Sequence, residues 1–98
     1  MRAYVLTYKG ERLEAKPKRG EDGRERETFP LEQMQDIVGG YIEVVGLTDE
    51  VLMVVNEEGK LNNLPLNKEA TKLFWRCFPE SPDYIVGNVL VCESSMIE

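Results

Sequence analysis

The sequence predicts an α+β fold in which two short helices pack on an antiparallel sheet of four to six strands, in the order β-β-α-β-β-(β)-α-β. Three observations support this prediction. Short runs of β-branched and aromatic residues indicate strands, two segments with apolar residues at helical spacing indicate helices, and the loops between neighbouring strands are too short for parallel crossovers. The length of 98 residues fits a single domain, 1–98, with one modest core.

Residues 1–16 are predicted to form a β-hairpin. Arg2 to Tyr8 alternates between two sets of side chains rich in β-branched and aromatic residues, which is typical of a strand. A two-residue turn at Lys9-Gly10 follows, with Gly10 in the positive-φ position, and Glu11 to Lys16 returns as a charged edge strand. We expect residues 1–30, which include the hairpin, and residues 68–98 to be additions to a centre formed by residues 31–67.

Residues 17–28 contain two glycines, one proline and almost no apolar side chain, so they are predicted to form a mobile charged loop. The mixed charges favour a solvated loop without a specific role. The alternative is a basic rim or lid over a site. Its basic side chains would be Lys16, Lys18, Arg19, Arg24 and Arg26.

The α/β body is predicted to span residues 29–92 and to begin with a helix of about two turns. Thr28 or Phe29 would cap this helix, Pro30 would lie in its first turn, and Gly39 would end it in a left-handed conformation. Its apolar face would consist of Leu31, Met34, Ile37 and Val38.

Two strands, Tyr41 to Val45 and Val51 to Val55, are predicted to form an antiparallel pair because a short loop joins them. The second strand is apolar on both faces, which places it inside the sheet with cover on each side, or against a partner chain. Asn56 to Lys60 is predicted to be a tight turn with Gly59 in the left-handed position. Leu61 to Leu64 would form a further short strand.

A second helix is predicted to start after the N-cap Asn67 and to end before Pro79. Its apolar face would consist of Ala70, Leu73, Phe74 and Cys77. Tyr84 to Cys92 is the last predicted strand, in which Gly87 marks a bulge or a close backbone approach. Residues 93–98 are predicted to be a frayed tail.

The charge is unevenly distributed. Residues 1–30 carry eight basic and six acidic side chains, whereas residues 31–98 carry four basic and twelve acidic ones, within a net charge of −6. An acidic body argues against direct binding of double-stranded DNA and favours a partner with a basic surface. Because no apolar run is long enough to cross a membrane and no signal peptide is recognisable, we expect a cytoplasmic protein that does not bind membranes.

The composition also argues against catalysis, so we expect no catalytic residues, no cofactor and no metal. The chain has no histidine, which removes the commonest general base and the commonest metal ligand. Cys77 and Cys92 lie in apolar patterns and are expected to be free, buried and unreactive. The adjacent carboxylates Asp49 and Glu50 fall far short of a calcium loop.

Polar residues around the predicted turn form the main candidate binding site, together with the aromatic Tyr41. Turn chemistry and helix capping account for Asn56 and Asn67 without any ligand. The alternative is a small-molecule or partner contact beside an apolar floor of Leu61, Leu64 and Leu66. The candidates in this region are Asn56, Glu57, Glu58, Lys60, Asn63, Asn67, Lys68 and Tyr41.

Three stretches, IVGGYIEVV, VVNEEGKLNNLPLN and IVGNVLVC, together resemble a known family. It is a small domain of unassigned function found in bacteriophages, plasmids and other bacterial mobile elements, and the resemblance covers Leu31 to Cys92. Family members often carry an arginine directly after the asparagine that closes the LPxN pattern, where this chain has Lys68. The resemblance implies a mobile-element origin without an activity, and it carries over no catalytic residues.

From this origin and the acidic composition we expect a non-enzymatic binding protein that antagonises a bacterial defence system by occluding a host effector protein. One alternative is an oligomeric sponge for a cyclic or otherwise nucleotide-derived immune signal, with basic side chains of the charged loop on its phosphates. A second alternative is a regulatory or structural module of the mobile element, and a third is a hydrolase. A homodimer or higher oligomer could form through Val51–Val55 or through Trp75 and Phe78.

Overall fold

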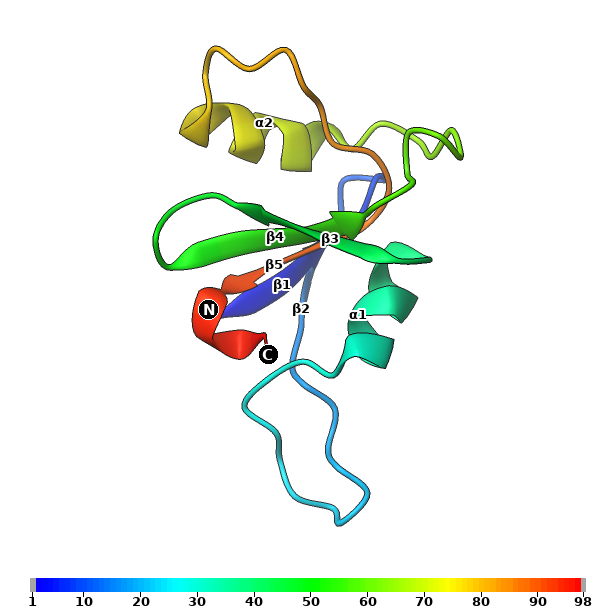
Figure 1. Cartoon of the computed structure of the whole chain (residues 1–98), viewed down its shortest axis with the longest axis vertical. Helices are drawn as coiled ribbons and strands as arrows, with labels where there is room; N and C mark the ends of the chain where they lie inside the picture. Colours follow the sequence, from blue (N-terminus) through cyan, green and yellow to red (C-terminus); the bar gives the residue numbers. More distant parts are fainter. Residues whose placement is uncertain (1, 98) are drawn as a thin grey trace.

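The chain folds into a five-stranded antiparallel sheet with one helix on each face, which confirms the predicted α+β fold (Figure 1). The computed structural model describes residues 2–97. Its strands are β1 (Ala3–Leu6), β2 (Arg12–Glu14), β3 (Ile42–Gly46), β4 (Val51–Asn56) and β5 (Val89–Glu93). The helices are α1 (Leu31–Val38) and α2 (Lys68–Cys77), and a short 3-10 helix follows β5 at Ser94–Met96. No described helix is long and apolar enough to span a bilayer.

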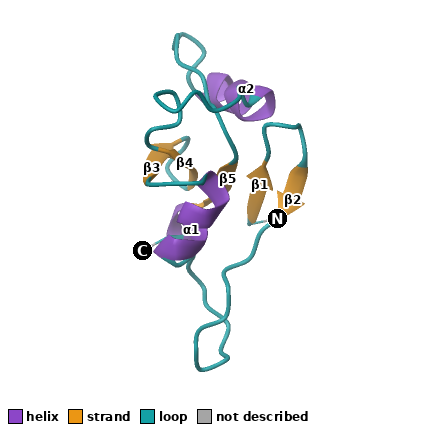
Figure 2. Ribbon diagram, turned by 90° about the vertical axis from the view of Figure 1, so that its right-hand side faces the viewer, coloured by secondary structure: helices purple, strands orange, loops and turns teal. Residues whose placement is uncertain are grey.

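The last strand of the chain lies in the middle of the sheet. The strand order is β2-β1-β5-β4-β3, and Figure 2 shows β3 and β2 at the two outer edges. β5 pairs with β1 from Ala3↔Cys92 to Leu6↔Val89, and on its other side with β4. The expectation that the N-terminal hairpin is an addition to a centre at residues 31–67 was therefore wrong, because β1 borders the central strand.

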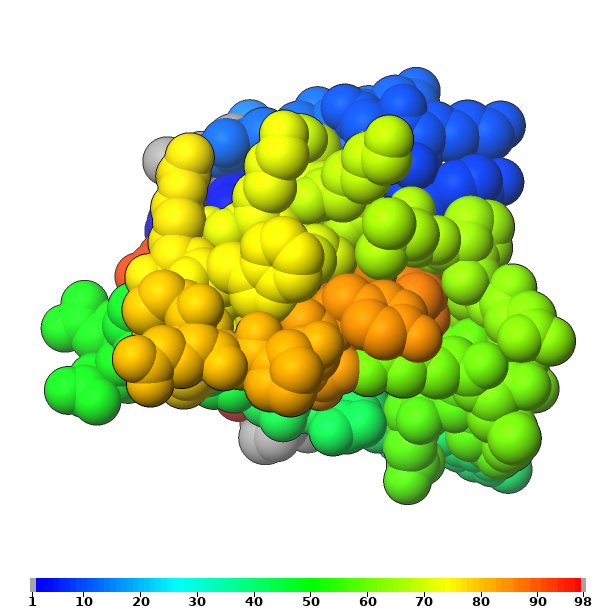
Figure 3. All heavy atoms as spheres, turned by 90° about the horizontal axis from the view of Figure 1, so that it is seen from above, coloured from blue at the N-terminus to red at the C-terminus, as the bar shows by residue number. Residues whose placement is uncertain are grey.

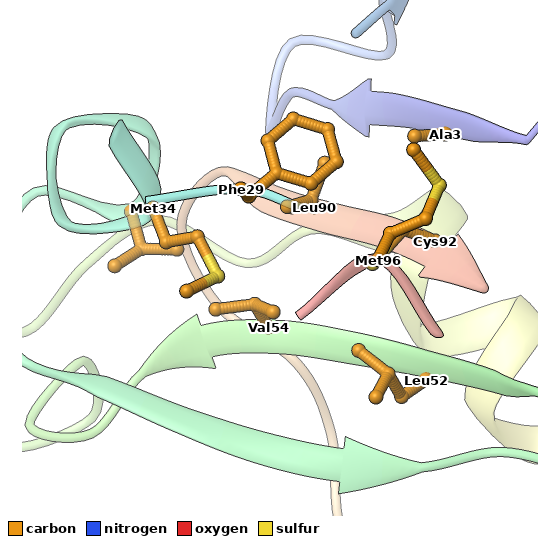
Figure 4. Packing of buried hydrophobic residues seen from close by; sticks show 9 residues of the cluster. Ala3, Phe29, Met34, Leu52, Val54, Leu90, Cys92 and Met96 are labelled. Atoms are coloured by element: carbon orange, nitrogen blue, oxygen red, sulfur yellow. The ribbon is translucent and has the colours of Figure 1, made fainter. Parts of the chain in front are cut away.

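The sheet has a hydrophobic core on each face. Leu52 and Val54 of β4 point toward α1, whereas Met53 and Val55 point toward α2, so the prediction of a strand covered on both sides is confirmed. The core on the α1 side, shown in Figure 4, contains Ala3, Phe29, Met34, Val38, Leu52, Val54, Leu90, Cys92 and Met96. The core on the α2 side contains Leu6, Leu47, Met53, Val55, Ala70, Phe74, Ile85, Val89 and Val91.

The N-terminal hairpin turns through three residues, not the predicted two. The amide of Thr7 donates to the carbonyl oxygen of Glu11 (2.9 Å), which leaves Tyr8, Lys9 and Gly10 as the loop. Gly10 has the predicted positive φ, +89°. This combination of a three-residue loop and a left-handed glycine is the next most common hairpin connection after the two-residue turns.

The C-terminal tail is packed, so the prediction of fraying was wrong for its described residues. Met96 is buried, and its carbonyl oxygen accepts a hydrogen bond of 2.7 Å from the amide of Phe29. Phe29 thereby fixes the start of α1, where Pro30 occupies the N-cap position predicted for Thr28 or Phe29. Leu31 is exposed, contrary to the predicted apolar face, whereas Gly39 ends α1 in the predicted left-handed conformation.

The connection after β4 is a helical turn, and the short strand predicted at Leu61 to Leu64 does not form. The turn closes with a Schellman pattern, in which the amide of Leu64 donates to Gly59 and that of Asn63 donates to Lys60. Asn63 therefore takes the left-handed conformation (φ +55°) that was predicted for Gly59. Gly59 has a different role, because a Cβ there would lie 2.8 Å from Cγ2 of Val86.

The segment before β5 is extended but mostly unpaired, so the last strand starts five residues later than predicted. Only an isolated bridge joins Leu66 to Val86. The predicted close approach at Gly87 is confirmed: its φ is +74°, and a Cβ there would lie 2.8 Å from the side chain of Leu64.

Asn67 connects three parts of the fold through one buried amide. Its Oδ1 accepts a hydrogen bond from the amide of Ala70, which makes it the predicted N-cap of α2. Its Nδ2 donates to the carbonyl oxygens of Leu6 (3.0 Å) and Gly87 (2.8 Å). The side chain is 0% exposed, so water cannot replace any of these bonds.

We predict that Asn67→Ala lowers the free energy of unfolding by about 3 kcal/mol, because the helix loses its cap and two buried carbonyl oxygens lose their donor. Urea unfolding followed by circular dichroism measures this loss. The exposed Asn62 supplies the matched control, and Asn62→Ala should change the stability by less than about 0.5 kcal/mol. Equal stabilities of the two variants would contradict the assigned role of Asn67.

Candidate functional site

The fold uses two of the predicted binding amides internally. Nδ2 of Asn56 donates to the carbonyl oxygen of Val38 at the end of α1 (3.1 Å), and its Oδ1 accepts from the amide of Glu58 (2.8 Å). Asn67 is fully engaged as described above. Each side-chain nitrogen and oxygen of Asn56 and Asn67 therefore has a hydrogen-bond partner within the chain, which accounts for both amides without a ligand.

Other members of the predicted cluster line a groove of about 140 Å³ on the α2 side of the sheet. Glu57 and Lys60 border it, and they are joined there by Glu43 from β3 and by Asp83 and Tyr84 from the segment before β5. Its more buried lining consists of the apolar Val45, Val55, Ile85 and Val86 and of the predicted Asn56, which is 8% exposed. Glu58, Asn63 and Lys68 are exposed outside this lining.

The groove is acidic because its single lysine is already paired. Nζ of Lys60 forms an ion pair with Oδ1 of Asp83 and lies 4.4 Å from the centre of the Tyr84 ring. The hydrogen bond from Lys60, followed by that from the amide of Tyr84, lowers the pKa of Asp83 below its usual value. Glu43 and Glu57 then carry the net charge of the groove.

Exposed aromatic side chains surround the groove. Trp75 and Tyr84 are each 44% exposed, and the indole N–H of Trp75 donates to the carbonyl oxygen of Asp83 (2.8 Å), which fixes α2 against this segment. Phe78 and Leu61 are also exposed. Figure 3 shows side chains of α2 (yellow), of the segment before β5 (orange) and of the 57–66 turn (green) meeting on one face. We call these residues, with Glu43, Glu57 and Asp83, the acidic aromatic surface.

Sequence reasoning missed Glu43, Asp83 and Tyr84 as members of this surface. The only signal for Glu43 was its position as the one charged residue in an otherwise apolar strand. Asp83 and Tyr84 gave no local signal, because they meet the turn only after β5 enters the sheet. Tyr41 is 66% exposed next to β3, and strand alternation places it on the same face as Glu43.

The charged loop lies at the opposite end of the molecule from the groove, below the sheet in Figure 1. Gln33 of α1 holds its first residues, accepting from the amide of Lys18 and donating to the carbonyl oxygen of Lys16 (2.8 Å each). The structure therefore does not bring the basic loop residues to the Asn56–Lys60 turn within one chain.

Acidic neighbours balance the charge of the loop. Ion pairs join Arg19 to Glu25 (3.5 Å) and Arg24 to Asp22 (3.8 Å). Arg26 lines a wide hollow of about 950 Å³ between the loop and the sheet. The other charged residues of this hollow are Arg2, Lys16, Arg19, Glu14, Glu25 and Glu27. This mixture of charges gives the loop no concentrated positive field for phosphate binding.

The thiols do not form a reactive site. Both cysteines are free, and burial raises the pKa of Cys92 to about 11. Cys77 is half-buried on α2. Among residues 2–97 the structure has no group of three acidic, cysteine or histidine side chains placed to hold a metal ion.

Most of the chain matches the model of one known protein family. Residues 11–96 match the model of a family described as a domain of unknown function, DUF3846. No curated protein and no solved structure matches the chain.

We predict that iodoacetamide modifies native Cys77 much faster than native Cys92. With a pKa of about 11 for Cys92, only about 0.1% of its thiol is ionised near pH 8. Mass spectrometry after timed alkylation measures both rates, and alkylation in denaturant provides the control in which both thiols react. Modification of native Cys92 at the rate of Cys77 would contradict the prediction.

Proposed function

The chain belongs to the DUF3846 family of domains of unknown function, and we propose that it is a non-enzymatic binding protein of a bacteriophage or other mobile element. In this proposal it antagonises a bacterial defence system by covering a basic surface of a host effector protein, such as the nucleic-acid groove of a nuclease. The origin rests on the resemblance of the IVGGYIEVV, NEEGK and LPxN stretches to proteins of mobile elements.

The observation that carries the proposal is the acidic aromatic surface. Trp and Tyr are enriched among the residues that contribute most to protein–protein binding, because they bury a large apolar area and lose little side-chain entropy. Here Trp75 and Tyr84 are half-exposed. The indole N–H of Trp75 donates to the carbonyl oxygen of Asp83, and Nζ of Lys60 lies 4.4 Å from the centre of the Tyr84 ring. A pre-organised aromatic pair beside an acidic groove favours a rigid partner that presents both apolar and basic groups.

The distribution of charge supports the same kind of partner. Residues 31–98 carry twelve acidic and four basic side chains, and one of those four, Lys60, is neutralised by Asp83 within the groove. An acidic surface accelerates encounter with a basic protein and excludes nucleic acid from the same place. A nuclease or other nucleic-acid-binding effector must present a basic groove, which makes it the class of target that fits best.

The geometry gives less support to a sponge for a nucleotide-derived signal. That function would combine the Asn56–Lys60 turn with the basic loop, but these two regions lie at opposite ends of the molecule (Figure 1). Only an oligomer could bring the loop of one copy to the turn of another. A regulatory or structural module of the mobile element is a further alternative, and a comparison of binding with phage plating separates it from the proposal.

We predict that the chain raises the plating efficiency of a phage on cells that carry a nuclease-based defence system, and that Glu43→Lys/Glu57→Lys removes this effect. Reversal of both charges places lysines against the basic surface of the effector. The affinity of the chain for the effector protein should therefore fall by about 100-fold or more. Trp75→Ala/Tyr84→Ala should also remove the effect. Affinity is measured by titration of the effector onto the immobilised chain at low and at high salt.

The control for charge reversal is Glu21→Lys/Glu27→Lys, which changes the net charge equally but lies in the loop at the other end. This variant should keep both binding and protection of the phage. Equal loss in both charge variants would show a non-specific charge effect and contradict the proposed surface. Binding without any change in plating would instead support the accessory module.

A further inference from the structure

The two edges of the sheet differ in how they are protected against additional strands. β2 is an edge of three residues, its exposed ends Arg12 and Glu14 are charged, and Pro17 follows it closely. Short length, charge and proline are the devices that keep an edge from pairing with another chain. β3, the opposite edge, has five residues, contains no proline and carries only one charged residue, Glu43.

The register of β3 shows which of its backbone groups face outward. The amide of Glu57 donates to Tyr41 and that of Leu47 donates to Val51, so the hydrogen-bonded positions toward β4 are the odd-numbered residues of this strand. The N–H and C=O groups of Ile42, Val44 and Gly46 consequently point away from β4. No further strand lies beyond β3 in the part of the chain that the structure describes (Figure 2).

We infer that β3 is a docking edge for an extended, basic segment of the protein partner, which would pair with it as a sixth strand. This inference rests on the proposed function for the identity of the partner class. The main-chain groups of Ile42, Val44 and Gly46 would supply the pairing, as in other cases of strand addition. Specificity would come from the side chains on the two faces of the added strand.

The side chains beside β3 define an alternating sequence in the partner. On the α1 face the added strand would contact Val44, which is 45% exposed, and Ile42, so apolar residues fit there. On the α2 face it would contact Tyr41 and Glu43, of which the second borders the acidic groove. Lysine or arginine fits on that face, because the cation can pair with the carboxylate and lie over the exposed tyrosine ring.

Charge also decides between this occupant and a second copy of the chain. Symmetric antiparallel pairing of two β3 strands about Val44 would place the β3–β4 turn of each copy, with Asp49 and Glu50, beside the Tyr41 end of the other. Glu57 is located at that end, because its amide donates to Tyr41. Like charges would then meet twice across the seam, which disfavours self-pairing and favours a basic partner.

The test uses a soluble peptide of alternating lysine and valine with the full-length chain, followed by amide hydrogen exchange in NMR spectra. We expect the amides of Ile42, Val44 and Gly46 to exchange at least about tenfold more slowly at saturating peptide. The odd-numbered amides of the strand, already bonded to β4, should change little. A peptide with glutamate in place of lysine should leave all of them unchanged.

The matched variants are Val44→Pro and Glu14→Pro, each of which removes an outward-facing N–H from one edge. In the β1–β2 pair the amide of Ala15 donates to Ala3, so Glu14 faces away from β1 just as Val44 faces away from β4. Val44→Pro should abolish peptide binding, whereas Glu14→Pro should preserve it. The exchange measurement on the unmodified chain decides the question even where a proline variant fails to fold.

The remaining outcomes overturn the inference in distinct ways. Peptide binding that protects other amides, or no binding, rejects the edge, and equal binding of the glutamate peptide rejects its basic specificity. Protection of the same amides by raising the protein concentration alone assigns the edge to a second copy. If the chain protects the phage but its effector leaves the β3 amides unprotected from exchange, only the inference about β3 is overturned. If the chain binds the peptide through β3 but never protects the phage, only the proposed function is overturned.

Discussion

The arrangement of the whole domain depends on the insertion of the last strand, β5, into the middle of the sheet. Val89 to Cys92 are all buried, so this strand needs a neighbour on each side and cover on each face. β1, from the start of the sequence, and β4, from its middle, supply the neighbours. The sheet can therefore not close until residues 3–6 and 89–92 meet, which makes its central pairing the most long-range contact of the fold.

Buried polar groups hold the connections around that central strand. The side-chain amide of Asn67 binds the end of β1, the approach to β5 and the first turn of α2 at once. The hydroxyl of Thr71 accepts a further hydrogen bond from the backbone amide of Ile85 (2.9 Å). Asn56 acts in the same way on the other side, where it joins the end of β4 to the end of α1. No buried polar side-chain atom lacks a partner among the described residues. Two asparagines that the sequence offers as ligand groups are thus part of the framework.

The sequence predicted those features that local physics determines. The apolar character of Val51–Val55 on both faces indicated a covered strand, the spacing around Phe74 indicated a helix, and Gly39 and Asn67 marked helix ends, all correctly. Some errors are local, such as the length of the Tyr8–Gly10 turn and the left-handed conformation of Asn63. Others fall where a partner lies far away in the sequence. Nothing near Met96 indicates that its carbonyl oxygen binds Phe29, and nothing near Gly59 indicates that Val86 packs against it. The same limit explains why only part of the candidate site was predicted, since Glu43, Glu57 and Asp83 converge from three separate segments.

Buried side-chain amides stabilise the fold, whereas exposed charges remain available for recognition. Because the fold uses Asn56 and Asn67 internally, the groove and its edge present mainly carboxylates, aromatic rings and the outward-facing backbone of β3. Carboxylates select for charge but tolerate many partners, whereas backbone pairing selects for an extended strand and tolerates many sequences. Under the proposed function, the two together would restrict the partner more than either does alone, to a basic chain that is extended at the point of contact. A compact acidic domain of this size would in that way recognise one class of protein without a deep pocket.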